Sequence, residues 1–285
     1  MNKLKLFIFA IVVIGLLAAC SSNSEDASAE STNGGTEQAE DKGKLTIGAT
    51  AGPYSDMVTK AIKPILEEQG YTIEVREFSD YVQPNLALGN GSIDANVFQH
   101  IIYMNSFAEG NNLELSDVIA IPTAPMGIYS KQFDTLENIE EGAEIAIPND
   151  PTNLARALLI LEREGLITIS EDVDPLTMSE KDVKDNYKNL QFRPIEAAQL
   201  PRTLDSVALA AVPGNFALAA NMELLDALKL ETLFEDYQNR VVVNTSDLEE
   251  QFVKDIQAAV ESVEFEQVID AEFQGFGKPE WMVNK

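Results

Sequence analysis

Apolar residues along the chain recur in two alternating patterns from Lys44 onward. Residues 44–50 form a short strand-like run, and residues 54–70 carry apolar side chains three and four positions apart, as one face of a helix does, before Gly70 stops the pattern. Residues 71–78 then alternate between apolar and polar side chains, as a half-buried strand does. This succession predicts an α/β protein in which helices cover parallel or mixed sheets.

The same alternation continues through the rest of the chain. Two strands are expected at 118–121 and 126–130. A second α/β unit follows, with expected strands at 144–148, 190–194 and 207–212 and expected helices at 151–164, 197–205 and 215–220. The last part of the chain predicts a strand at 241–243 and helices at 248–263 and 266–273.

Both ends of this globular part have the pattern of one unit, and its middle has the pattern of another. Crossings between them are expected near residues 123–125 and 237–240. The first lobe would then be discontinuous and the second would be inserted into it; the expected boundaries are 44–124 with 240–285, and 125–239. Two α/β lobes joined by a two-strand hinge enclose a cleft, and such a cleft is a natural ligand site.

The stretch 78–103 surrounds a Gly-Asn-Gly turn at 89–91. Its apolar pattern predicts helices at 82–88 and 98–108, with a short strand-like run at 93–97 between them. Chemically it is the richest part of the chain, and we expect it to form one wall of a ligand pocket.

Aromatic side chains and the only histidine of the chain gather in this stretch, as Phe78, Tyr81, Phe98, His100 and Tyr103. Packing in an ordinary core is one interpretation, because aromatic residues most often have that role. The amides of Asn85, Asn96 and Gln99 favour a site, since buried polar groups need partners. A box of aromatic and imidazole rings suits a thioether side chain, because sulfur contacts ring edges favourably.

A second candidate site residue follows the strand at 144–148. Asp150 and Pro151 are a good helix start, with an N-cap acceptor followed by proline at the first helical position. Asn153 and Arg156 are then three residues apart, on one face of the first turns. The planar fork of arginine suits a carboxylate, although a surface ion pair between Arg156 and one of the many acids is the alternative.

Catalytic and nucleic-acid-binding functions are poorly represented. The chain has one histidine and one cysteine, no GxSxG elbow, no Gly-rich phosphate loop and no cluster of His and Cys ligands, so we expect neither enzyme activity nor a cofactor or metal. A formal net charge of −27 repels a phosphate backbone, so no nucleic-acid partner is expected.

The N-terminal residues form a targeting segment. Two lysines precede an apolar run that is shorter than a transmembrane helix, and residues 1–20 end in Leu-Ala-Ala-Cys. Cys20 is the only cysteine and has no intrachain disulfide partner, which favours another role for its thiol. An ordinary secretory leader, in which the cysteine lies near the cleavage site by chance, is the alternative interpretation. Residues 21–43 have few apolar side chains and six acids, which predicts a disordered acidic tether.

Several motifs resemble those of NlpA-type substrate-binding lipoproteins of methionine ABC importers. They occur in the family's order through residues 44–280: GATAGPYSDM (48–57), EFSDYVQPNLAL (77–88), DANVFQHIIY (94–103), APMGIYSKQF (124–133), IAIPNDPTNLARALLILEREGLI (145–167), NYKNL (186–190) and EAAQLPRTLD (196–205). The Leu-Ala-Ala-Cys sequence likewise resembles a lipobox, in which the cysteine is lipidated and becomes the mature N-terminus.

The resemblance implies a type II periplasmic-binding-protein-like fold, with two α/β lobes closing on a methionine-like amino acid. It implies a chain held at the extracytoplasmic face of the cell membrane by a lipid on Cys20, with a monomeric body that delivers its ligand to an ABC permease and its ATPase. Residues carried over by motif as ligand-binding are the side-chain box Tyr81, Phe98, His100 and Tyr103, the carboxylate clamp Arg156 with its neighbour Asn153, and the polar partners Asn215 and Asn239.

The chain departs from the family pattern at the polar end of the expected ligand. Pro213 stands where the family usually has an asparagine, while Asn215 and Phe216 keep the pattern. Three further positions depart from the family pattern: Ala51 stands where proline is common, Tyr54 where histidine is common, and Ile102 where the family has proline. Proline has no N–H and no side-chain amide, so another amino acid, a methionine derivative or a Met-containing short peptide is an alternative ligand. A surface interaction protein without transport is the alternative function.

Overall fold

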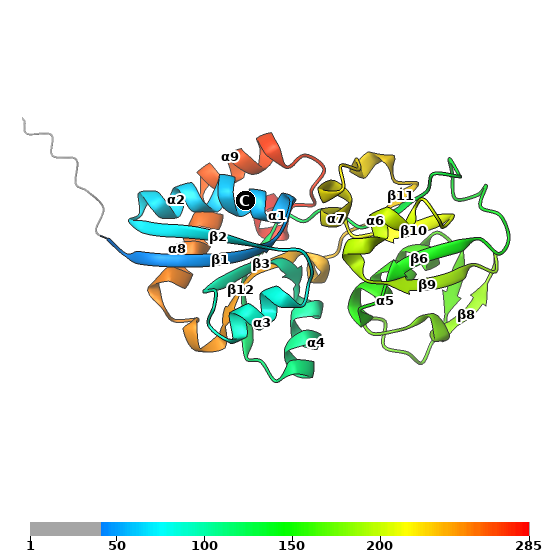
Figure 1. Cartoon of the computed structure of the whole chain (residues 1–285), viewed down its shortest axis with the longest axis horizontal. Coiled ribbons are helices and arrows are strands. Elements are labelled where there is room, and N and C mark those ends of the chain that lie inside the picture. The colour runs from blue at the N-terminus through cyan, green and yellow to red at the C-terminus, as the bar shows by residue number, and fades with distance from the viewer. Residues whose placement is uncertain (1–40, 285) are drawn as a thin grey trace, which may run out of the picture. The chain divides into compact units, whose positions relative to one another are not determined.

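The computed structural model describes residues 41–284 and contains two five-stranded sheets (Figure 1). The first has the order β2-β1-β3-β12-β4; the strands are β1 (Gly43–Thr50), β2 (Tyr71–Phe78), β3 (Ala95–His100), β4 (Leu115–Ile121) and β12 (Asn239–Asn244). β1 runs parallel to β2 and β3, and β12 runs antiparallel to β3 and β4. This sheet and its helices are the first lobe.

Two groups of helices cover the two faces of the first sheet. One face packs against α1 (Pro53–Met57), a π-helical turn η1 (Val58–Ile62), α2 (Lys63–Glu68), α8 (Gln251–Val260) and α9 (Val263–Glu272). The other packs against α3 (Gln83–Gly89) and α4 (Ile101–Asn111), and a short α10 (Glu280–Val283) follows near the C-terminus. Segments from both ends of the chain therefore build one lobe.

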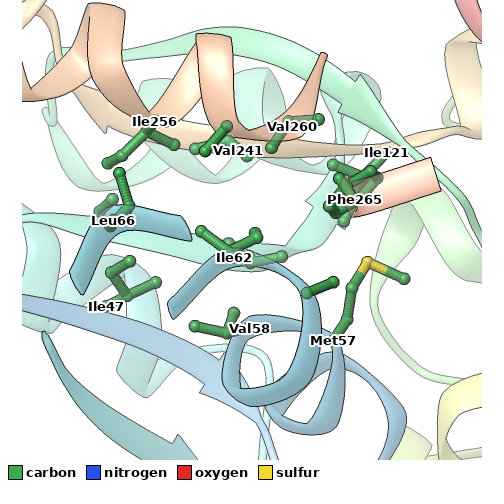
Figure 2. Packing of buried hydrophobic residues seen from close by; sticks show 14 of the residues in the cluster. Ile47, Met57, Val58, Ile62, Leu66, Ile121, Val241, Ile256, Val260 and Phe265 are labelled. Atoms are coloured by element: carbon green, nitrogen blue, oxygen red, sulfur yellow. The ribbon is translucent and has the colours of Figure 1, made fainter. Parts of the chain in front are cut away.

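Buried apolar side chains hold the helices against one face of the first sheet. Ile47 of β1 and Val241 of β12 lie beneath side chains at helical spacing from η1, α2, α8 and α9, and Ile62, Ile256 and Phe265 of those helices are almost fully buried (Figure 2). Burial of each such side chain contributes about 1.5–3 kcal/mol relative to exposure. The N- and C-terminal helices are thereby packed into a single core.

The second sheet has the order β11-β5-β10-β6-β9 and forms the second lobe with its helices. Its strands are β5 (Gly127–Tyr129), β6 (Glu144–Pro148), β9 (Gln191–Ile195), β10 (Leu209–Val212) and β11 (Lys229–Leu230). One face packs against α5 (Pro151–Arg163); the other packs against α6 (Leu200–Thr203), after the 3₁₀ turn η3 (Ala197–Gln199), and α7 (Gly214–Ala219). In the first sheet β1 lies between β2 and β3, and in the second sheet β6 lies between β9 and β10.

Smaller elements complete the described chain. A two-stranded sheet joins β7 (Ile167–Ile169) to β8 (Val183–Asn186), and the remaining 3₁₀ turns are η2 (Glu180–Asp182), η4 (Leu224–Asp226), η5 (Glu235–Tyr237) and η6 (Thr245–Asp247). The sequence patterns did not predict β7, β8 or β11. Each has four residues or fewer, too few for a hydrophobic period to become visible.

The expected α/β architecture with two sheets is confirmed, and most predicted elements have the predicted type. One expectation was wrong: residues 98–100 belong to β3, whereas a helix was expected from residue 98. Helices pack on both faces of β3 and all six of its residues are buried, so its pattern shows no alternation. The helix begins at Ile101, with His100 as its N-cap.

The chain passes between the two sheets twice, from β4 to β5 through residues 122–126 and from β11 to β12 through residues 231–238. The leader 1–20 with Cys20, and all but the last residues of the expected tether 21–43, lie outside the described residues. Among residues 41–284, no helix has the length and the apolarity needed to cross a membrane.

Candidate functional site

One pocket is lined by residues of both lobes and has a cavity volume of about 20 Å³. All eight residues predicted to bind the ligand line it: Tyr81, Phe98, His100, Tyr103, Asn153, Arg156, Asn215 and Asn239. The remaining lining residues are Tyr54, Gln99, Thr123, Ala124, Pro213 and Gly214. A cavity of this size has room for about one water molecule, so an amino acid can enter only if the lining residues move apart.

Aromatic rings form the apolar wall of this pocket. The ring centre of Tyr81, which lies between β2 and α3, is 5.8 Å from that of Phe98 on β3 and 5.8 Å from that of Tyr103 on α4. Phe216 of the second lobe is closer still, with its ring centre 4.8 Å from that of Tyr81. Phe98 and Tyr103 are buried, so the wall presents ring faces and edges to an apolar ligand side chain.

His100 is held in its neutral form at the start of α4. Its Nδ1 accepts a hydrogen bond from the backbone N–H of Tyr103, so the ring proton is on Nε2, which lies 3.3 Å from Oδ1 of Asn153. Burial and the positive charge of Arg156 lower the pKa of His100 to about 3, although the contact with Asn153 raises it. The imidazole therefore carries no charge near neutral pH.

The N-terminal turn of α5 is built as its sequence predicts. The carboxylate of Asp150 accepts a hydrogen bond from the backbone N–H of Asn153, and Pro151 follows at the start of the helix. Burial raises the pKa of Asp150, while hydrogen bonds from Asn153 and Thr152 lower it. These contacts orient Asn153 so that its Oδ1 faces His100.

Arg156 is buried one turn further along α5 and is paired with Glu231. Nε of Arg156 donates to Oε2 of Glu231 over 2.7 Å, and Nη2 donates to Oε1, so the contact is bidentate. Both side chains are about 5% exposed, at 6% and 4%. Burial lowers the pKa of Arg156, and the charge and hydrogen bonds of Glu231 more than offset this, so the pKa is raised.

The sequence left two alternatives for Arg156, a place in the ligand site and a surface ion pair, and the structure agrees with each in part. It lines the predicted pocket, and it also forms an ion pair with an acid, which is buried and not on the surface. Nη1 of Arg156 lies 3.5 Å from Oδ1 of Asn153 and is not engaged by Glu231. This edge of the guanidinium remains available to an anionic group in the pocket.

Asn215 on α7 and Asn239 on β12 both contribute amides to the pocket wall. Oδ1 of Asn215 accepts a hydrogen bond from the hydroxyl of Tyr81 over 2.7 Å, while its buried Nδ2 has no partner among residues 41–284. Asn239 starts β12; its Nδ2 donates to the carbonyl of Phe98 and its backbone N–H donates to Oγ1 of Thr123. The wall therefore keeps an unused amide donor for a ligand.

Beneath the pocket lies a buried cluster of three amides, Asn85, Asn96 and Gln99. Asn85 Nδ2 donates to Gln99 Oε1 over 2.7 Å, and Asn85 Oδ1 accepts from Asn96 Nδ2 over 2.9 Å and from Gln99 Nε2 over 2.6 Å. Each of the three is at most 2% exposed. The cluster joins α3 to β3, which carries Phe98 and His100, and so positions that wall.

The residues that the sequence did not single out are those whose environment is set by tertiary structure. Glu231 is one of many acids in the chain, and no motif distinguishes it. Tyr237, at the end of η5, stacks on Arg156, with 5.2 Å between the guanidinium carbon and the ring centre. Tyr54 accepts a hydrogen bond from the backbone N–H of Ala124; only its departure from the family pattern could have indicated it.

The described pocket can bind a ligand but offers little for catalysis. Its histidine is neutral, and the ring proton on Nε2 faces an amide oxygen, not a nucleophile. Within residues 41–284, no three His, Cys, Asp or Glu side chains are grouped so that they could hold a metal. Aromatic rings, an arginine edge and a free amide donor together suit a small molecule with an apolar side chain and a carboxylate.

Comparison with known proteins agrees with this geometry. A family model described as NlpA lipoprotein matches residues 45–281. The probable D-methionine-binding lipoprotein MetQ of Vibrio cholerae is 36% identical over 246 residues, which is 86% of this chain and 91% of that protein. The probable D-methionine-binding lipoprotein MetQ of Pasteurella multocida is 34% identical over 96% of this chain and 98% of its own length.

A solved structure has the same fold. The nutrient-binding protein of Burkholderia cenocepacia, solved bound to methionine, superposes with a TM-score of 0.78 and 37% identity, covering 81% of this chain and 97% of that one. The resemblance noted in the motifs is confirmed, and with it the type II periplasmic-binding-protein-like fold class.

Proposed function

The chain belongs to the NlpA lipoprotein family, and on that premise we propose that it is the extracytoplasmic substrate-binding lipoprotein of an ABC transporter, which captures methionine or a close relative and delivers it to a membrane permease. The observation that carries the proposal is that all eight residues inferred from the motifs line one small pocket between elements of the two lobes. Residues 44–124 with 240–285 form one lobe and 125–239 form the other, and they close on the ligand.

Each wall of the pocket has a separate role in this proposal. Tyr81, Phe98, Tyr103 and neutral His100 enclose the ligand's side chain, where ring edges favour a thioether. The Nη1 edge of Arg156 and the free Nδ2 of Asn215 receive the carboxylate. Asn153 orients both His100 and Arg156, and Asn239 fixes the start of β12 beside the ligand.

The remaining parts of the proposal concern delivery. A lipid on Cys20 anchors the chain to the membrane, and residues 21–43 tether a monomeric body that docks on the permease of an ABC importer with its ATPase. The family is one of substrate-binding proteins, and we assign this chain no catalytic activity and no cofactor.

Isothermal titration calorimetry of the purified protein tests the function, after unfolding and refolding have removed any bound amino acid. L-methionine, D-methionine, other apolar amino acids and Met-containing dipeptides are titrated in turn. We expect saturable binding of at least one methionine-containing ligand; absence of binding to all of them would overturn the proposal.

A matched pair of variants tests the role of Arg156. Arg156→Ala removes the clamp, and we expect binding to weaken by at least a hundredfold. Arg163→Ala is the control, because Arg163 lies two turns along the same helix, is exposed, and stacks on Phe234, outside the pocket. Equal affinities of the two variants would remove Arg156 from the site.

One observation favours a second candidate ligand. Pro213 lines the pocket and is buried, and neither its ring nor its nitrogen can donate a hydrogen bond. A Met-containing short peptide or another amino acid would fit such a head-group wall. The dipeptide and amino-acid arms of the calorimetric titration separate these ligands.

A further inference from the structure

The positive charge of Arg156 is already compensated before any ligand binds. Glu231 takes the Nε–Nη2 edge of the guanidinium in a bidentate contact, and both side chains are withdrawn from water. The carboxylate of Glu231 is itself held in place, because the backbone N–H of Met126 donates to Oε1. Arginine therefore presents an oriented donor edge to the pocket, but hardly any uncompensated charge.

Glu231 acts from behind the arginine and does not itself line the ligand pocket. With Arg156 and Tyr237 it lines a separate small pocket. A ligand in the main pocket meets Nη1 of Arg156, and Glu231 influences that ligand only through its charge and through the pose of the arginine.

A second, half-buried carboxylate, that of Asp150, is hydrogen-bonded to the pocket residue Asn153. Every hydrogen bond made to Asp150 by Asn153 and Thr152 comes from a donor, which is the arrangement of an ionised carboxylate. His100 is neutral, as its hydrogen bonds show. Among the described residues, the charged groups that hydrogen-bond to Arg156 or Asn153 are thus two anions, Glu231 and Asp150, beside the one cation, Arg156.

This balance discriminates between ligands by their charge. A zwitterionic amino acid brings a carboxylate for the donor edge and an ammonium that the net negative surroundings favour. The same molecule without its amine brings a lone negative charge into a desolvated site whose only arginine is already paired, and burial of an uncompensated charge is costly.

We propose that Glu231 is a specificity-determining residue, which restricts the pocket to ligands that carry a cationic amine and excludes the corresponding monoanionic acids. The inference rests on the proposed function, since it concerns the ligand of that same pocket. Glu231 lies outside the pocket wall and would select ligands by their net charge.

The test compares two ligands that share one side chain. Methionine is the zwitterion, and 4-(methylthio)butanoate is the same molecule without the amine and with a charge of −1. For the wild-type full-length protein we expect calorimetry to show at least a hundredfold preference for methionine. In Glu231→Gln, which keeps the shape of the side chain but removes its charge, we expect this preference to shrink at least tenfold.

Two further variants separate charge from packing. Glu235→Gln removes a charge from the same connection, but Glu235 pairs with Arg240 and not with Arg156, so the preference should stay as in the wild type. Glu231→Asp keeps the charge and alters the reach, so it should weaken methionine binding yet retain the preference. It also provides the measurement if Glu231→Gln fails to fold.

The outcomes are distinguishable from failure of the proposed function. If the wild type binds neither methionine nor any related ligand, the proposed function itself is wrong. If the wild type binds methionine and 4-(methylthio)butanoate equally well, or if Glu231→Gln weakens both by the same factor, the function stands and the role of Glu231 in specificity is overturned.

Discussion

The hydroxyl of Tyr81 donates a hydrogen bond to Oδ1 of Asn215, with 2.7 Å between the two atoms. Tyr81 precedes α3 of the first lobe, and Asn215 lies on α7 of the second. The same tyrosine packs on Phe216, the next residue of α7. One side chain that lines the pocket thus joins the two lobes, by a polar contact and an aromatic one.

Removal of this hydroxyl should weaken ligand binding without changing the fold. In Tyr81→Phe the ring contacts remain, but Oδ1 of Asn215 loses its donor when the lobes close. A hydrogen bond of this kind contributes about 0.5–1.5 kcal/mol, so we expect roughly 2- to 10-fold weaker binding in calorimetry. The free energy of unfolding without ligand should change by less than about 1 kcal/mol.

Tyr129→Phe is the matched control for this variant. Tyr129 is buried in the second lobe outside the pocket, and its hydroxyl has no hydrogen-bond partner among residues 41–284. Loss of that hydroxyl should leave affinity unchanged and stability equal or higher. Affinity loss of the same size in both variants would show that the Tyr81–Asn215 bond does not contribute to binding.

His100 should make the protein sensitive to mild acid. In the folded protein its pKa is lowered from 6.5 to about 3, so below pH 6.5 the unfolded chain takes up a proton that the folded chain does not. The free energy of unfolding therefore falls as pH drops from 6.5 towards 3. At pH 5 the loss from this residue is about 2 kcal/mol, at about 1.4 kcal/mol per pKa unit.

Urea denaturation at pH 7 and pH 5 measures this loss, with His100→Gln as the reference. Glutamine cannot take up a proton, and no other histidine is present in the chain. Carboxylates whose pKa also differs between the two states, such as Asp150, act equally in both proteins and cancel in the difference. Parallel pH profiles of the two proteins would contradict the buried, neutral histidine.

Local sequence signals predicted the parts of this structure whose causes are local. The start of α5 at Pro151 follows from an N-cap acid and a proline, and the structure has that cap. The boundary between β3 and α4 does not follow in this way. His100 becomes an N-cap only because β1 and β12 hold the preceding residues in a strand, and that pairing joins segments far apart in the chain.

In the site, too, some residues could be predicted from local sequence and others only from the folded structure. Six of the eight predicted site residues lie in the quoted motifs, so resemblance could indicate them, and all eight line one pocket. Glu231 lies in no motif, 75 residues from the arginine that it pairs with. An acid at that position is one of 47 in the chain, and only the folded arrangement distinguishes it from the solvated ones.

The amide cluster beneath the pocket should contribute to stability more than its small size suggests. Asn85→Leu retains approximate side-chain volume but removes the donor to Gln99 Oε1 and the acceptor of Asn96 Nδ2, while Gln99 Nε2 keeps its bond to Asn96 Oδ1. Each unsatisfied group costs about 1–3 kcal/mol, so we expect the free energy of unfolding to fall by about 3 kcal/mol or more. Urea denaturation without ligand measures it.

Asn105→Leu is the control, because Asn105 is exposed on α4 and substitutions at such positions change stability by about 0.5 kcal/mol or less. A similar small change in both variants would mean that the cluster does not hold α3 against β3.

Pro213 offers a final prediction about the polar end of the ligand. It is the residue before α7, its backbone is extended with φ −56° and ψ 134°, and no side-chain hydrogen bond caps the helix. Asparagine adopts this conformation readily and is the residue that the family pattern has here. Pro213→Asn therefore adds an amide to the pocket wall without a change in backbone.

One additional hydrogen bond is worth about 0.5–1.5 kcal/mol, so Pro213→Asn should bind methionine roughly 2- to 10-fold more tightly in calorimetry. Pro213→Ala is the control at the same position, since it removes the ring and adds no amide, and its affinity should stay near that of the wild type. If both variants bind methionine equally well, the amide has no partner on the ligand. If Pro213→Asn binds methionine less tightly than Pro213→Ala, the proline fits the natural ligand better than the family's asparagine does, and that ligand differs from methionine at its polar end.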